Sequence, residues 1–342
     1  MRTILVTGAA GFIGSNFVRI LLSRGESVKL VALDKLTYAG NLANISDLLS
    51  DTKRLVFVRG DICDKALVEK IWDEHKVTEV VHFAAESHVD RSIQDSGPFI
   101  VTNVIGTQVL LDVAKAKGVE KFLHVSTDEV YGTLPEDRPE VKFTEETPLQ
   151  PNSPYSASKA ASDCLVRAYF HTFKLPVMTT RCSNNYWPFQ FPEKLIPLFI
   201  TNLMEGKKVP LYGDGLNVRD WLYVEDHCDA IWTVLNKGTF GEVYNIGGNN
   251  ELTNRRITET VLREMNKSWD ESVTYVKDRP GHDRRYAIDA GKMYRELRWT
   301  PKFQWESAIQ TTIKWYKDKE TWWKSIKSGE YLKYYESQYA GR

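Results

Sequence analysis

The chain has 342 residues, of which 42% are hydrophobic and 26% charged, as in an ordinary globular protein with a large core. Its 45 basic and 45 acidic residues cancel, which argues against nucleic acid or an anionic membrane as a partner, so any phosphate site must be local. The four cysteines are scattered and show no metal-ligand spacing, so we expect no metal and a reducing compartment. There is no room for a signal peptide, and no apolar run is counted as long enough to span a membrane, so we expect a cytoplasmic protein.

Short apolar segments alternate with amphipathic helical patterns in the first half of the chain. The predicted strands are residues 3–7, 28–33, 56–59, 80–84 and 122–126, and the predicted helices include residues 13–24, 66–74, 101–117 and 155–173. This alternation predicts an α/β domain with a doubly wound parallel sheet, covered by helices on both faces. Ligands of such sheets bind beyond the carboxyl ends of the strands, where the chain has Gly8, Asp34, Asp61, Ala84 with Ala85, and Thr127.

After about residue 183, prolines and glycines divide the chain into loops and short elements. This change predicts a smaller, mixed C-terminal domain that closes over the edge of the sheet. A strand-like return at residues 242–246 could rejoin the sheet. We expect the first domain to comprise residues 1–183 with a returning segment near 219–250, and the second to comprise residues 184–218 and 251–342.

A glycine-rich turn joins the first predicted strand to the first predicted helix. Gly8 permits a tight turn, Gly11 lets the backbone approach a pyrophosphate, and Gly14 lets the helix pack closely on the sheet. The helix N-terminus offers unpaired N–H groups to the anion. Asp34 stands 20 residues beyond Gly14, where a carboxylate can accept from both ribose hydroxyls. The pattern predicts a Rossmann-type site for NAD rather than NADP, although Lys35, next to Asp34, weakens the preference for NAD slightly. The alternative is a glycine-rich turn without a ligand.

A tyrosine and a lysine share one face of the helix predicted at residues 155–173. Ser153 is placed to cap this helix and Pro154 to occupy its first position. Tyr155 and Lys159 are one turn apart. We expect the lysine ammonium and a cationic nicotinamide to lower the pKa of the phenol, which makes Tyr155 a base for a hydroxyl group. The alternative is an ordinary surface pair.

Two adjacent carboxylates, Asp128 and Glu129, follow Thr127 at the end of the fifth predicted strand. Neighbours on a regular strand point to opposite faces, so the two can share a site only if the strand has already ended. Gly132 and Pro135 favour such a turn. Close carboxylates separate their proton affinities, which gives one acid and one base. The alternative is a solvated acidic turn.

Several motifs of this chain resemble a known superfamily of enzymes. TGAAGFIG at residues 7–14, HFAAESHVDRS at 82–92 and YSASK at 155–159 resemble the extended short-chain dehydrogenase/reductases. Four further segments look like the dTDP-glucose 4,6-dehydratase family, a resemblance that covers nearly the whole chain. They are STDEVYG at 126–132, NNYWPFQFPEKLIP at 184–197, NVRDWLYVEDHCDAI at 217–231 and RPGHDRRYAID at 279–289.

The resemblance implies an NAD-dependent lyase of deoxysugar biosynthesis that converts dTDP-glucose to dTDP-4-keto-6-deoxyglucose and water. The expected steps are oxidation at C4, elimination across C5–C6 and reduction at C6, with hydride carried by NAD. Tyr155, supported by Lys159, would take the 4-hydroxyl proton, and Thr127 would hold that hydroxyl. Glu129 would remove the C5 proton, and Asp128, protonated, would give its proton to the departing 6-hydroxyl.

The resemblance also assigns binding residues and a partner. The first domain would bind NAD and the second the nucleotide sugar, and two subunits would pair as a homodimer through a four-helix interface formed by residues 101–117 and 155–173. The NAD residues are Gly8, Gly11, Phe12, Ile13, Gly14, Asp34, Lys35, Thr37, Asp61, Ile62, Ala84, Ala85, Ser87, Thr102, Tyr155, Lys159 and Asn185. The substrate residues are Ser87, Thr127, Asn184, Lys194, Leu195, Pro210, Tyr212, Arg219, Asn254, Arg279 and His282.

One position departs from the family pattern, and two other functions stay open. Trp187 stands where the family leads us to expect glycine, so its indole either narrows the sugar pocket or points outward. Arg284 is either a phosphate ligand or a solvated charge. A 4-epimerase or a dehydratase of another nucleotide hexose is one alternative function, although an epimerase has no use for Asp128 and Glu129. A non-catalytic NAD sensor is the other.

Overall fold

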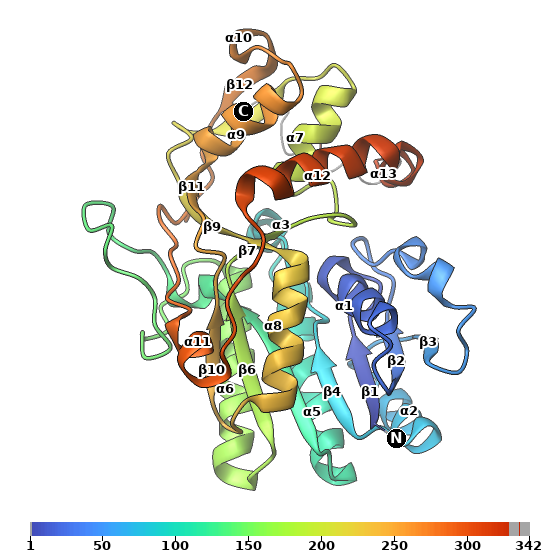
Figure 1. Cartoon of the computed structure of the whole chain (residues 1–342). Coiled ribbons are helices and arrows are strands. Elements are labelled where there is room, and N and C mark those ends of the chain that lie inside the picture. The colour runs from blue at the N-terminus through green and yellow to red at the C-terminus, as the bar shows by residue number, and fades with distance from the viewer. Residues whose placement is uncertain (1, 328–334, 336–342) are drawn as a thin grey trace.

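The computed structural model of the protein describes residues 2–327 and 335 (Figure 1). A seven-stranded parallel sheet, in the order β10-β6-β5-β4-β1-β2-β3, confirms the predicted doubly wound α/β domain. The return of the chain is confirmed as well, because β10 pairs with β6. The strands are β1 (Arg2–Thr7), β2 (Val28–Asp34), β3 (Leu55–Arg59), β4 (Glu79–His82), β5 (Lys121–Thr127), β6 (Val177–Cys182) and β10 (Val243–Ile246).

Helices cover both faces of this sheet because its strands are apolar on both sides. In Figure 1, α1 and α8 lie together on the near face, and α5 lies behind the strands. Buried leucines such as Leu5, Leu30 and Leu33 fill the core. The helices of this unit are α1 (Phe12–Ser23), α2 (Lys65–His75), α3 (Val89–Gln94), α5 (Thr107–Lys117), α6 (Pro154–Phe173), α8 (Val224–Lys237) and α11 (Gly291–Leu297), with 3-10 turns η1 (Leu42–Asn44), η2 (Ser46–Leu48) and η4 (Asp128–Tyr131).

The helix predicted at residues 101–117 is longer than expected. It begins as α4 (Gly97–Phe99), widens into a π turn, η3 (Ile100–Gly106), and continues as α5. By length and composition alone, the segment Gly97–Lys117 is long and apolar enough to cross a membrane, so the expectation of no such run was wrong. Leu110, Leu111 and Val113 are nevertheless buried against the sheet, and α5 packs on α2 and α6.

A smaller unit stands above the carboxyl ends of the large sheet (Figure 1). Its three-stranded sheet has parallel and antiparallel pairs, which confirms the predicted mixed architecture. Its elements are β7 (Asn184–Tyr186), β8 (Val209–Tyr212), β9 (Val218–Tyr223), β11 (Glu251–Thr253), β12 (Val273–Val276), α7 (Leu195–Met204), α9 (Asn254–Glu264), α10 (Trp269–Ser272), α12 (Trp305–Asp318) and α13 (Glu320–Ile326). The functional division into two domains stays a prediction, and residues 328–334 and 336–342 lie outside the described residues.

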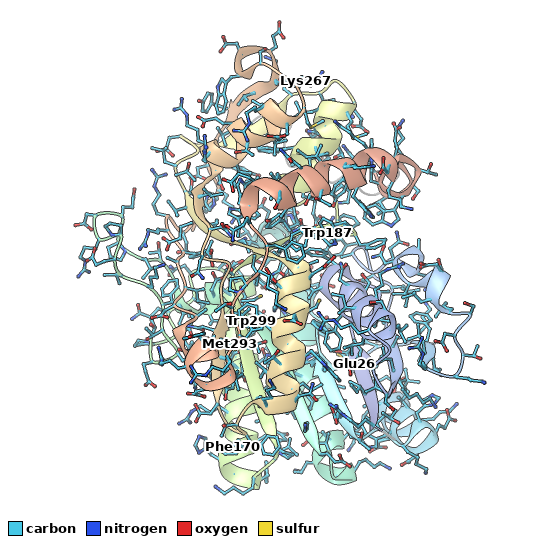
Figure 2. The ribbon with its side chains drawn as sticks, viewed as in Figure 1. Glu26, Phe170, Trp187, Lys267, Met293 and Trp299 are labelled. Atoms are coloured by element: carbon cyan, nitrogen blue, oxygen red, sulfur yellow. The ribbon has the colours of Figure 1, made fainter. Side chains whose placement is uncertain are left out.

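Trp187 lies at the junction of the two units (Figure 2). Its ring centroid is 4.4 Å from that of Tyr223, and the indole packs against the hydrophobic cores of both units. Its backbone has φ of +153°, a conformation that favours glycine. The indole lines a groove beside α1 with Arg19 and Phe189 and is absent from the lining of the cavity described below. It therefore joins the two cores.

Candidate active site

A cavity opens beyond the carboxyl ends of the central strands, where the smaller unit faces the sheet. Every residue assigned from the sequence to NAD lines it, together with all the predicted catalytic residues and four of the substrate residues. The lining includes Gly8, Gly11, Phe12, Ile13, Gly14, Asp34, Lys35, Thr37, Asp61, Ile62, Ala84, Ala85, Ser87, Thr102, Thr127, Asp128, Glu129, Tyr155, Lys159, Asn184, Asn185 and Lys194. The fold thus gathers residues from the whole first half of the chain, and their binding roles remain predictions.

The glycine turn has the geometry that its sequence predicts. Gly8 has φ of +68°, and a Cβ there would lie 2.7 Å from the Ala84 nitrogen. A Cβ at Gly14 would lie 2.2 Å from the Gly8 carbonyl oxygen, so the helix could not approach the strand. At Gly11 a Cβ would meet only this carbonyl oxygen, at 3.2 Å, and otherwise project into the cavity. The turn, with the N-terminus of α1 behind it, is a cradle that fits a dinucleotide pyrophosphate.

Carboxylates at the ends of β2 and β3 border the same cavity. The Asp34 Oδ2 accepts a hydrogen bond from the Ala10 nitrogen at 2.9 Å, and its Oδ1 accepts one from the Leu36 nitrogen at 2.8 Å. Asp34 therefore stabilises the glycine turn, a structural role that the sequence did not reveal. Each carboxylate oxygen keeps a second lone pair for a ribose hydroxyl. Lys35 and Asp61 form an ion pair of 2.6 Å across the strand ends.

Tyr155 and Lys159 stand where the helix prediction puts them. Ser153 and its partner Ser156 form a reciprocal cap, with Pro154 as the first residue of α6, which confirms the predicted start. The expected lowering of the phenol pKa was wrong for this protein chain alone. Burial, followed by the charge of Glu129, holds the pKa of Tyr155 well above its ordinary range. The Lys159 Nζ instead donates to the Val125 carbonyl at 2.9 Å, and burial lowers its pKa to about 8.

The two adjacent carboxylates do share one site. β5 ends at Thr127, and η4 turns Asp128 and Glu129 into the cavity before Gly132, with φ of +87°, redirects the chain. Asp128 is 1% exposed, and its Oδ2 accepts no hydrogen bond from the described residues. Burial, and then the charge of Glu129, raises its pKa well above the ordinary range. A neutral carboxylic acid next to a second carboxylate is the pair that an elimination requires.

Glu129 has a different electrostatic environment. Burial raises its pKa, while the charges of Arg279, Lys194 and Arg219 act in the opposite direction and favour the carboxylate form. For Asp128 the charges of Glu129 and Asp220 raise the pKa further, and each acts more strongly than Arg219 does in the opposite direction. The arrangement therefore favours Asp128 as the acid and Glu129 as the base.

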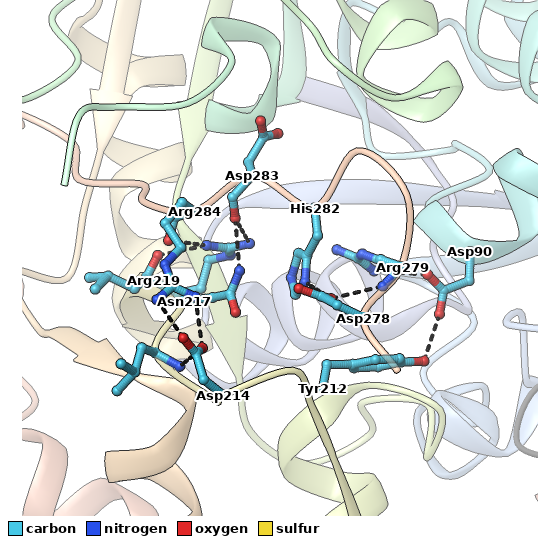
Figure 3. Close-up of polar contacts among 12 residues, drawn as sticks. Asp90, Tyr212, Asp214, Asn217, Arg219, Asp278, Arg279, His282, Asp283 and Arg284 are labelled. Atoms are coloured by element: carbon cyan, nitrogen blue, oxygen red, sulfur yellow. Dashed lines mark hydrogen bonds and ion pairs between the residues drawn. The ribbon is translucent and has the colours of Figure 1, made fainter. Parts of the chain in front are cut away.

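Most of the remaining substrate residues form a polar cluster (Figure 3), and the charges of Arg279 and Arg219 in this cluster act on Glu129. Arg279 Nη1 donates to Asp90 Oδ1 at 3.0 Å, and the Tyr212 hydroxyl donates to Asp90 Oδ2 at 3.2 Å. The rings of Tyr212 and His282 meet edge to face at 6.2 Å. Arg219 is 6% exposed, and its Nη2 donates to the Asp283 carbonyl at 2.8 Å. An aromatic pair next to one buried and one half-buried guanidinium group suits a base followed by phosphates.

Four predicted or candidate residues stand apart from this cluster. Leu195 begins α7 and packs against the aromatic core of the smaller unit, and Pro210 pairs with Thr274 between β8 and β12. Asn254 reaches the cluster only through the Asn217 carbonyl, to which its nitrogen donates at 3.0 Å. The Arg284 guanidinium forms a two-pronged ion pair with Asp214. The exposed-charge alternative for Arg284 thus fits better than a phosphate ligand.

Sequence reasoning missed Glu193, which lines the cavity, and the residues that contact it or the polar cluster. Glu193 is 8% exposed and lies 3.3 Å from the Arg91 Nε, and burial raises its pKa to about 7. The Arg91 guanidinium stands 4.0 Å over the ring of Tyr38. Asp90 joins Arg279 and Tyr212 as described above. Asp90 and Arg91 belong to the segment that follows β4, so their place after a strand end could have marked them as candidate site residues. Glu193 comes directly before Lys194 and does not follow a strand of the large sheet.

Three comparisons place this geometry among known proteins. A family model described as GDP-mannose 4,6 dehydratase matches residues 5–312. A dTDP-glucose 4,6-dehydratase of Xanthomonas campestris pv. campestris strain B100 is 53% identical over 348 residues and 97% of each chain. The crystal structure of a dTDP-glucose 4,6-dehydratase from Streptomyces venezuelae, with NAD bound, has a TM-score of 0.91 at 50% identity and covers 95% of this chain and 99% of that one. A Thermus thermophilus UDP-glucose 4-epimerase in complex with NAD has a TM-score of 0.85 at 32% identity, covering 93% and 99%.

Proposed function

This chain belongs to the dTDP-glucose 4,6-dehydratase family, and we propose on that basis that it converts dTDP-glucose to dTDP-4-keto-6-deoxyglucose and water. One observation carries the proposal: η4 brings Asp128 and Glu129 into the same cavity as Tyr155 and the glycine turn. Had the two carboxylates pointed to opposite faces of the sheet, no elimination could be assigned to them.

The chain's own residues divide the work of the reaction. Tyr155 accepts the proton of the sugar 4-hydroxyl, which Thr127 holds in place. The C4 ketone then acidifies the C5 proton, which Glu129 removes, and Glu129 returns a proton to C5 once C6 has been reduced. Asp128, which burial keeps protonated, gives its proton to the departing 6-hydroxyl. The roles of Asp128 and Glu129 follow from their different electrostatic environments, and those of Tyr155 and Thr127 from their place in the same cavity.

NAD, when bound, supplies the hydride acceptor at C4 and the hydride donor at C6. The glycine turn, Asp34 and the N-terminus of α1 would hold it, and Lys159 lies deep in the same cavity. No net oxidation occurs, so the same dinucleotide serves every turnover. Retention of NAD by the purified protein is therefore expected.

The Arg279 and Arg219 cluster would bind the diphosphate, and Tyr212 with His282 would flank the base. In this proposal residues 184–218 and 251–342 form the nucleotide-sugar domain, and residues 1–183 with the returning segment near 219–250 form the NAD domain. Arg219 reaches the diphosphate from that returning segment. The preference for thymine is carried by the family relationship. The charges of Arg279 and Arg219 act on Glu129, which supports placing the sugar between these cations and the nicotinamide.

The 4-epimerase alternative is weaker on two counts. An epimerase needs Tyr155 and Thr127 but has no use for a protonated Asp128 beside Glu129. The epimerase comparison is also more distant, at 32% identity against 50% for the dehydratase structure. A non-catalytic NAD sensor would have no reason to bury either carboxylate.

The test is to incubate the purified protein with dTDP-glucose and no added cofactor, and to follow the sugar by NMR. The expected product is the 4-keto-6-deoxy sugar, formed with retained NAD. A galactose product would establish the epimerase function instead. Recovery of unchanged substrate from protein that still contains NAD would overturn the proposal.

A homodimer is part of the proposal, through the face that carries α3, the π turn and the end of α6. Ile93, Ile100, Val101, Ile105 and Phe173 on this face are each 40% exposed or more. Burial of these side chains against a second copy would add hydrophobic stabilisation. Light scattering should give twice the chain mass, and Ile105→Asp should halve it.

The cysteines are free thiols, which supports a reducing, cytoplasmic location.

A further inference from the structure

A buried carboxylate that the proposed mechanism does not use lies one helical turn below Lys159. Tyr155, Lys159 and Asp163 follow one another at intervals of four residues on α6, so they share one face. All three are buried, with Asp163 4% exposed. Asp163 is absent from the cavity lining and forms an ion pair with Arg181 on β6.

One oxygen of Asp163 is committed to an arginine and the other is not. The Arg181 Nε donates to Oδ2 at 2.8 Å, and Arg181 Nη1 donates to the Tyr131 hydroxyl at 3.0 Å. Oδ1 lies 3.3 Å from the His124 Nε2 but accepts no hydrogen bond in the described part of the chain. The Arg181 charge therefore occupies only one side of this carboxylate.

The histidines near Lys159 cannot supply a compensating charge. The Ser162 hydroxyl donates to the Lys159 carbonyl at 2.8 Å, so it must accept from His124 Nε2, which lies 3.1 Å away. His124 thus carries its proton on Nε2, and burial lowers its pKa to about 4. His82 lies between the hydroxyls of Thr7 and Thr107, at 2.7 and 3.0 Å, and burial also holds its pKa well below the ordinary range.

Lys159 itself has little in its surroundings to stabilise an ammonium. Its Nζ has one hydrogen-bond acceptor among the described residues, the Val125 carbonyl. Burial lowers its pKa, the charge of Asp163 is the largest effect in the opposite direction, and the Cys182 sulfur adds less. Burial raises the pKa of Cys182, so it is a neutral thiol. Asp163 is the nearby group that offers a full negative charge.

We infer that Asp163 is a positioning residue that keeps the Lys159 side chain protonated next to Tyr155. The inference rests on the proposed function, because the benefit is an ammonium next to the phenol during proton transfer. In structural terms, α6 carries a row of three functional groups, with the counter-charge furthest from the sugar. Arg181 fixes the carboxylate without neutralising it completely.

The pH dependence of turnover tests this inference. Wild-type activity should fall on the alkaline side as Lys159 loses its proton, near its pKa of about 8. Asp163→Asn leaves Arg181 without its partner and risks loss of folding, so the decisive protein is the double variant Asp163→Asn/Arg181→Met, which removes the whole ion pair. Of the two charges removed, Asp163 is the one that acts on the Lys159 pKa, so the alkaline midpoint should move down by about one pH unit, a loss of about fivefold in kcat at pH 8.

Two further proteins complete the experiment. Asp163→Glu retains the carboxylate and should restore the wild-type midpoint. Asp229→Asn is a matched control, because Asp229 is also a helical aspartate paired with an arginine, Arg24, at 2.7 Å, and lies outside the cavity. It should leave the profile unmoved. A folded double variant that holds NAD and keeps the wild-type midpoint would overturn the inference, whereas an inactive wild type would overturn the proposed function instead.

Discussion

Replacement of Asp128 by asparagine should make the protein more stable while it abolishes turnover. Asp128 is 1% exposed, and burial with the neighbouring Glu129 charge raises its pKa well above the ordinary range. At neutral pH it is a neutral acid, and asparagine has nearly the same shape and the same charge. Asparagine cannot release a proton, so the elimination should slow by about 10²- to 10⁴-fold.

The stability change has a sign that depends on pH. An aspartate in the unfolded chain releases its proton near pH about 3.9. The folded protein retains that proton, so wild-type stability falls as pH rises above this value, until the raised pKa of Asp128 is passed. The slope is at most about 1.4 kcal/mol per pH unit. Asp128→Asn removes this loss, so its advantage over wild type should grow by up to about 3 kcal/mol between pH 5 and 7.

Urea unfolding at pH 5, 6 and 7 measures this difference directly. Asp47→Asn is a suitable control. The Arg19 hydrogen bond lowers the pKa of Asp47, so the aspartate stays ionised from pH 5 to 7 in both the folded and the unfolded chain, and the asparagine stays neutral. Its difference from wild type should stay constant. A constant difference for Asp128→Asn would show that Asp128 ionises normally and would refute its assignment as the acid.

Three other substitutions have definite expected results. Glu129→Gln should retain the initial C4 oxidation but lose exchange of the C5 proton with deuterium oxide by at least about 100-fold; normal exchange would remove Glu129 from the role of base. Gly14→Ala, whose Cβ would lie 2.2 Å from the Gly8 oxygen, should cost about 1–3 kcal/mol in urea unfolding and reduce the NAD retained on purification. Ser153→Ala removes the reciprocal cap with Ser156 and should cost about 0.5–2 kcal/mol, with normal thermal stability as the contrary result.

The sequence was sufficient to predict features that depend on neighbours along the chain. The alternation of apolar strands and helices, the turn at Gly8 and the cap at Ser153 are local, and the structure has all of them. The turn after Thr127 was also predictable, because Gly132 needs a positive φ. These features depend on backbone conformations that a few residue types favour.

What the sequence could not reveal depends on contacts between distant segments. Asp90 and Arg279 are 189 residues apart in the chain yet form an ion pair, and Glu193 meets Arg91 across 102 residues. The sequence led to a wrong expectation for the pKa of Tyr155. Burial of the phenol raises this pKa, and that burial depends on segments that are distant in the chain. Spacing predicts that a tyrosine and a lysine share a helix face, but solvent exposure follows from tertiary packing.

The division of labour between the two carboxylates depends on the smaller unit. Asp128 and Glu129 come from one turn at the end of β5, yet Arg279 and Lys194, which the smaller unit carries, favour the charged form of Glu129. In the proposed function the same cations meet the diphosphate. Phosphate oxygens would offset part of their charge, which raises the proton affinity of Glu129 and makes it a stronger base. Substrate binding would therefore strengthen the base at the moment when the C5 proton must leave.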